Sequence, residues 1–73
     1  MPTTQSLAAR LLIAERLVRD GQYAIIRQRN LIVYRQALGR VTEGSEQLLA
    51  QFERSQVLFE NDLARLQLER AVS

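Results

Sequence analysis

Residues 45–71 read SEQLLAQFERSQVLFENDLARLQLERA, and their apolar pattern decides the fold. Apolar side chains recur there at alternating spacings of three and four, and the series is broken only by Gln56. This spacing places the apolar side chains along one side of an α-helix, as in coiled coils. The stretch therefore predicts a helix that packs against another helix through Leu49, Phe52, Phe59, Leu63 and Leu66.

The first half of the chain predicts another helix, over about residues 6–38, with apolar side chains on a wider front. At about 100° per residue they form two adjacent arcs, which together exceed the stripe of a helix with a single neighbour. We therefore expect this helix to contact neighbours on more than one side. The candidate contact residues are Leu11, Val18, Ile25 and Ile32, in an arc with Leu7 and Ala14; the adjacent arc contains Ile13, Leu17, Ala24 and Leu31.

Glycine interrupts these patterns at two places. Gly39 and Gly44 lie in a polar segment, 39–45, which predicts a hinge between two long antiparallel helices in a single all-α domain over residues 1–73. Asp20-Gly21 leaves alternatives open, because glycine weakens a helix interior and is favoured just past a helix end. We prefer an unbroken hairpin; the alternatives are a three-helix form broken at 20–21 and a pair of strands within residues 22–35.

Hydroxyl side chains predict where the helices begin. Such a side chain accepts a hydrogen bond from an amide that has no partner in the first helical turn. Thr3, Thr4 or Ser6 is therefore expected to cap the first helix, and Ser45 the second.

The composition argues against enzyme chemistry. The chain has no cysteine, histidine or lysine, so thiolate nucleophiles, the commonest metal ligands and the usual activating bases are missing. Its isolated glycines form no phosphate-binding loop motif. We therefore expect a protein that is not an enzyme and holds no metal or cofactor.

Neither a membrane span nor a secretory signal peptide is expected. No apolar run approaches the roughly 20 residues that a membrane-spanning helix needs. Charged residues interrupt the only candidate for the apolar region of a signal peptide. The default expectation is a cytoplasmic protein.

The two halves of the chain carry opposite charge. Residues 1–40 have seven arginines and two acidic residues, a net charge of +5, whereas residues 41–73 have three arginines and six acidic residues, a net charge of −3. Arginine pairs well with carboxylates at partly buried interfaces. Arg10 and Arg35 fall within the apolar arcs, so we expect them to form ion pairs at an interface.

Polar residues also punctuate the second helix. Glu46, Glu53 and Glu60 recur every seven residues and predict a salt-bridging side next to the apolar stripe. Gln56 lies within the stripe itself. It either fixes the register of helix pairing, as polar residues in coiled-coil seams do, or occupies a partly exposed position.

Nucleic-acid binding is the alternative function. Four arginines are interleaved with amide and tyrosine side chains, and such groups contact phosphates and bases. On a single helix, however, they scatter instead of forming one phosphate-tracking face. The candidates are Arg27, Arg29, Arg35 and Arg40.

Residues 61–72, NDLARLQLERAV, resemble the end of the last coiled-coil helix in TolC-type outer-membrane efflux ducts, where Leu-Ala and an Arg-Ala ending recur. The resemblance implies a fragment of an efflux-duct coiled coil as a further alternative. The glycine that often follows this ending is Ser73 here, and no functional residue is carried over.

The sequence as a whole predicts a structural or assembly protein. A chain of 73 residues with apolar side chains on several sides of its helices has too little volume to bury them all in one copy. We therefore expect a small helical subunit or accessory factor that binds itself, as an oligomeric bundle, or a partner protein in a larger complex.

Overall fold

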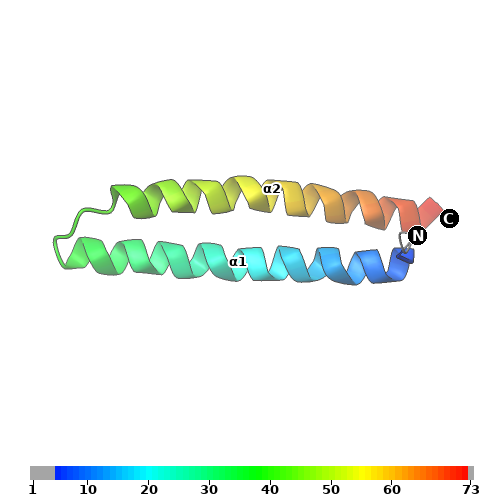
Figure 1. Ribbon diagram of the computed structural model, residues 1–73, viewed down its shortest axis with the longest axis horizontal. Helices are drawn as coiled ribbons and strands as arrows, with labels where there is room; N and C mark the ends of the chain where they lie inside the picture. The colour runs from blue at the N-terminus through cyan, green and yellow to red at the C-terminus, as the bar shows by residue number, and fades with distance from the viewer. Residues whose placement is uncertain (1–4, 73) are drawn as a thin grey trace.

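The computed structural model describes residues 5–72, which form two antiparallel α-helices packed along their whole length (Figure 1). Helix α1 spans Leu7–Ala37 and helix α2 spans Glu43–Val72. Residues 38–42 connect them, and no strand occurs among the described residues. The predicted all-α hairpin is confirmed.

The helix ends show which caps the chain uses. Ser6 has an extended backbone, and its Oγ accepts a hydrogen bond of 3.1 Å from the Ala9 amide, as predicted; Thr3 and Thr4 lie outside the described residues. The prediction for Ser45 is wrong. Helix α2 begins two residues earlier, at Glu43, and Ser45 is buried inside its first turns.

Helix α1 continues through Asp20 and Gly21, so the three-helix alternative is wrong. The pair of strands within residues 22–35 is wrong too, because that segment is helical throughout. A Cβ atom on Gly21 would lie 1.8 Å from Gln56 Oε1 of the other helix. Glycine is present here because α2 needs the space, and tertiary packing overrides its poor helix propensity.

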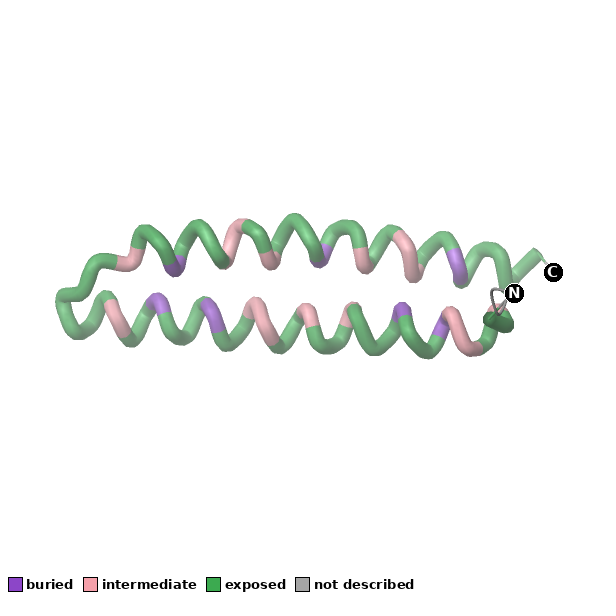
Figure 2. Tube along the Cα trace, viewed as in Figure 1, coloured by how far each residue is buried: buried purple, intermediate pink, exposed green. Residues whose placement is uncertain are grey.

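The two helices meet along a single seam, in which buried and half-buried residues of each helix face the other (Figure 2). Its members follow the three-and-four spacing of a coiled coil on both helices. On α1 the seam consists of Leu7, Leu11, Ala14, Val18, Gly21, Ile25, Gln28, Ile32 and Arg35; on α2 it consists of Ser45, Leu49, Phe52, Gln56, Phe59, Leu63 and Leu66.

The tightest apolar packing lies at the end of the hairpin that is far from the connection. Leu11, Ala14 and Leu66 are buried there, with Leu7 and Leu63 packed against them. Toward the connection the seam becomes more polar, since Gln28 and Ser45 are also buried. The hairpin therefore has a thin, mixed core.

Candidate interaction surfaces

All the residues predicted as an interface lie in the seam. Leu11, Ile32 and Leu66 are buried, and the others are half-buried between the two helices. The chain therefore uses these side chains to hold its own helices together. The half-buried members are Val18, Ile25, Leu49, Phe52, Phe59 and Leu63.

Polar side chains bridge the seam at two levels. Near the connection, Gln28 Nε2 donates to the Ser45 carbonyl at 2.8 Å, and the Arg35 guanidinium donates to the Ser45 hydroxyl. At mid-length, Gln56 Nε2 donates to the Val18 carbonyl at 2.9 Å. These bonds satisfy donors that would be costly to bury alone.

Gln56 is only 6% exposed, so the interpretation that it occupies a partly exposed position is wrong. Its Oε1 atom is buried and accepts no hydrogen bond from residues 5–72. A buried polar atom without a partner costs about 1–3 kcal/mol. Polar residues that fix the register of a coiled coil carry such a cost in stability. The interpretation that Gln56 fixes the register of helix pairing therefore stays a prediction.

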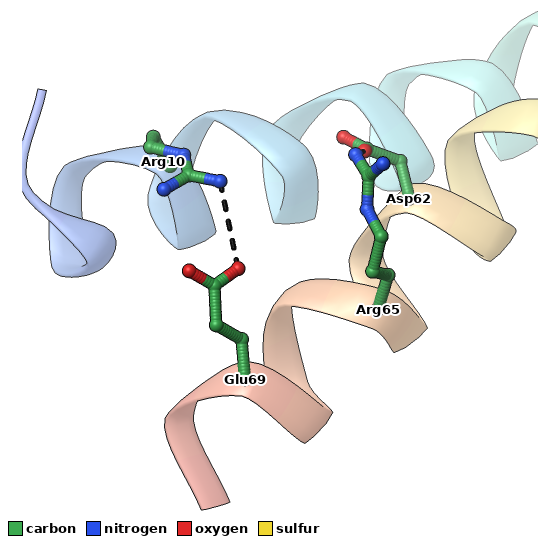
Figure 3. Close-up of polar contacts among 4 residues, drawn as sticks. All are labelled: Arg10, Asp62, Arg65 and Glu69. Carbon is green, nitrogen blue, oxygen red and sulfur yellow. Dashed lines mark hydrogen bonds and ion pairs between the residues drawn. The ribbon is translucent and has the colours of Figure 1, made fainter. Parts of the chain in front are cut away.

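Two ion pairs connect the helices, one on each side of the seam. Arg10 lies 3.6 Å from Glu69 on one side (Figure 3), and Arg29 lies 3.5 Å from Glu53 on the other. The side chains are between 42% and 60% exposed, so solvent screens both pairs and each contributes little to stability. The contact of Asp62 with Arg65, also drawn in Figure 3, lies within α2.

Arg35 differs from the expectation of an ion pair. Its partner among the described residues is the hydroxyl of Ser45, not a carboxylate. The reason is the register of the two helices. In the seam, Ser45 is the α2 residue opposite Arg35, whereas the neighbouring Glu46 is exposed and lies outside the seam.

The arginines of the nucleic-acid alternative do not form one surface. Arg27 and Arg29 are about 200° apart around α1, and Arg29 points toward Glu53. Arg35 lies in the seam, and Arg40 lies in the connection. Phosphate binding needs basic groups gathered on one side, and this arrangement does not provide them.

Carboxylates are likewise spread along the hairpin. Among residues 5–72 no three acidic side chains are grouped as a metal site would require. Over the same residues, neither helix is apolar enough along its length to cross a lipid bilayer.

The two flanks of the seam differ in character. One flank carries Glu15, Gln22, Glu60 and the Arg29–Glu53 pair, all exposed, together with the exposed Leu12, which lines a groove beside Glu15. The other flank carries the predicted second arc of α1, which extends into a stripe with the same three-and-four spacing as the seam. We call it the outer stripe; it consists of Ile13, Leu17, Asp20, Ala24, Arg27, Leu31, Tyr34 and Leu38.

The outer stripe is largely exposed in the hairpin. Ile13 is 46% exposed, Leu17 41%, Leu31 37%, Tyr34 62% and Leu38 50%. Leu48 of α2, 40% exposed, lines the same shallow groove as Leu31. Residues spaced in this way present a continuous ridge to a neighbour.

No protein-family model, curated protein or solved structure matches the chain. The resemblance of residues 61–72 to efflux ducts gains no support from these comparisons. The surfaces of the hairpin therefore provide the basis for a functional proposal.

Proposed function

We propose that this chain is a non-enzymatic assembly module, a helical hairpin that binds another protein chain through the outer stripe of α1. The observation that carries the proposal is the exposure of its large apolar side chains, between 37% and 62%, in coiled-coil spacing. Isolated exposed leucines are ordinary, but large apolar side chains repeated along one side of a helix, here interrupted by Asp20 and Arg27, are typical of a protein interface.

The thin core supports the same proposal. Only Leu11, Ala14, Ile32 and Leu66 are apolar and buried among the described residues, and no side chain there is less than 2% exposed. A chain of 73 residues with no cysteine for a disulfide is only marginally stable on its own, and association is one of the ways in which such small chains gain a sufficient core. A helix docked on the outer stripe would cover both that stripe and the adjacent edge of the seam.

Native size measurement tests the proposal. In a gentle extract from cells that express the tagged chain at its natural level, size exclusion should show a complex well above the mass of one chain. Leu17→Glu should move the protein to the monomer position, because a charge in the ridge cannot be desolvated cheaply. Leu68→Glu is the matched control, since Leu68 is 66% exposed on α2, away from the outer stripe.

A wild-type chain that runs as a monomer in the extract would refute the assembly role. So would equal loss of the complex in both variants, because it would show that the outer stripe has no special part. Circular dichroism should show the same helix content in all three proteins, since both substituted leucines are exposed.

A further inference from the structure

We propose that the outer stripe receives a second copy of this chain, whose α1 packs antiparallel against the first about a two-fold axis at Ala24. This inference rests on the proposed assembly function and names its partner. It arises from the order of residues within the outer stripe, together with their exposure in the hairpin.

The outer stripe is complementary to itself when it is reversed. An antiparallel two-fold contact pairs residues that lie at matched distances on either side of the axis. With the axis at Ala24, Leu17 and Leu31 lie seven residues before and after it, so Leu17 faces Leu31 of the second copy. Ile13, eleven residues before Ala24, lies within one residue of the level of Tyr34, which is ten residues after it. Ala24 faces Ala24 of the second copy, and the small alanine side chains permit close approach of the two helices.

The charges of the stripe follow the same symmetry. Asp20 and Arg27 are its only charged members, and they have opposite sign. They lie four residues before and three residues after Ala24, so their levels match to within one residue. Both are exposed, and among residues 5–72 neither takes part in an ion pair. Asp20 and Arg27 are seven residues apart on α1, which is about two helical turns and a rise of roughly 10 Å, so they do not pair with each other within one helix. Across the axis, each Asp20 meets Arg27 of the second copy.

Other arrangements of two copies fit less well. A parallel contact would place Asp20 beside Asp20 and Arg27 beside Arg27. A contact of the stripe with α2 of the second copy, at the level it has in its own hairpin, would set Leu17 against Asp62, since these two residues line one groove. The antiparallel pairing of α1 avoids both conflicts.

The positive charge of α1 does not prevent this pairing. Arg10 and Arg29 are already paired with Glu69 and Glu53 of the same chain. Next to the stripe, the antiparallel arrangement brings Arg16, eight residues before Ala24, near Asn30 of the second copy, six residues after it, and not opposite another arginine. These three arginines therefore bring no like charges together at the contact.

Charge exchange provides the decisive test, with the mass of the purified full chain measured by light scattering. Asp20→Arg and Arg27→Asp should each weaken the dimer by about tenfold or more, because each creates like-charge contacts across the axis. Mixing these two variants should restore a dimer of wild-type affinity. The double variant, Asp20→Arg with Arg27→Asp, should also recover it.

Cross-linking locates the axis independently. The chain has no cysteine, so Ala24→Cys introduces a unique thiol on the proposed axis. A short bis-maleimide should link two such chains efficiently. Ala64→Cys, on the exposed side of α2, is the matched control and should stay unlinked at the same concentration.

The outcomes separate this inference from the assembly role. A purified wild-type chain that stays monomeric, beside a large complex in the extract, would refute the second copy and leave the assembly role standing. Dimers that ignore the charge exchange would refute the antiparallel pairing. A monomer in both experiments would refute both proposals.

Discussion

Gly21 and Gln56 form one structural unit at mid-length of the seam. The missing side chain of Gly21 leaves room for the amide of Gln56, which reaches the Val18 carbonyl on α1 at 2.9 Å. A Cβ atom on Gly21 would come within 1.8 Å of Gln56 Oε1 and 2.9 Å of its Cδ. Gly21, which suggested a helix break in the sequence, therefore provides the space that the side-chain amide of Gln56 occupies.

A double-mutant cycle tests this unit. Gly21→Ala alone should lower the free energy of unfolding by about 1–2 kcal/mol, because the amide must leave a buried site and lose its bond to Val18. In a Gln56→Ala background the same change should stabilise by up to about 1 kcal/mol, through helix propensity. Urea unfolding measures both values.

Gly44→Ala is the control for this cycle. Nothing lies within 4 Å of a Cβ atom at that position, so the change should not destabilise the chain. If Gly21→Ala has the same effect with and without Gln56, the two residues are not coupled and the explanation of Gly21 is wrong.

At the scale of the elements, the connection depends on one backbone conformation. Gly39 has a φ of 70°, in the left-handed region that glycine adopts without steric cost. Its amide donates to the Gln36 carbonyl at 3.0 Å and closes the end of α1. This residue turns the chain so that α2 can return along α1.

Gly39→Ala should therefore destabilise the hairpin by about 1–2 kcal/mol, the cost of a left-handed residue with a Cβ atom. Gly39→Asn should cost less, because asparagine tolerates this region better. Thermal unfolding followed by circular dichroism measures the order of the three proteins. Equal stability of Gly39→Ala and wild type would show that the connection relaxes to another turn.

The apolar patterns of the sequence predicted most of the seam on α2 and only part of it on α1. The stripe of α2 predicted its seam from Leu49 to Leu66, because its apolar members are consecutive except for Gln56. On α1 the seam includes Gly21, Gln28 and Arg35, which a pattern of apolar side chains does not identify. Their three-and-four spacing from Leu7 was the available signal.

Other features could not be derived from local patterns. The burial of Ser45 depends on Gln28 and Arg35, which lie 17 and 10 residues away in the chain. The continuity of α1 at Gly21 depends on Gln56 in α2. These contacts form only when the helices pair. They determine that Ser45 is a seam residue and not a helix cap, and that Gly21 is a packing site and not a helix break.

At the scale of the whole molecule, the hairpin is one layer thick. Its principal extents are 53, 28 and 14 Å, and among residues 5–72 no third element covers either flank of the seam. The flank with Glu15, Gln22 and Glu60 places charged and amide groups in water, whereas the flank with the outer stripe exposes Leu17 and Leu31. Covering that flank converts a marginal two-helix unit into a bundle with an interior.

The stability of the chain should then depend on its concentration. If folded copies associate, mass action raises the melting temperature as protein concentration increases. Over a hundredfold range we expect a rise of several degrees for wild type and none for Leu31→Glu. A wild-type melting temperature that stays constant over this range would show that the hairpin is stable as a single copy.

The antiparallel course of the helices also brings the two extremities of the described chain together. Leu7 packs against the cluster that contains Leu66, at the end opposite the 38–42 connection (Figure 1). A surface loop of a host protein could therefore carry this hairpin as an insert, with little displacement of its own backbone. For the same reason, a short bridge between the extremities and a cut in the connection would give a circular permutant with the same packing.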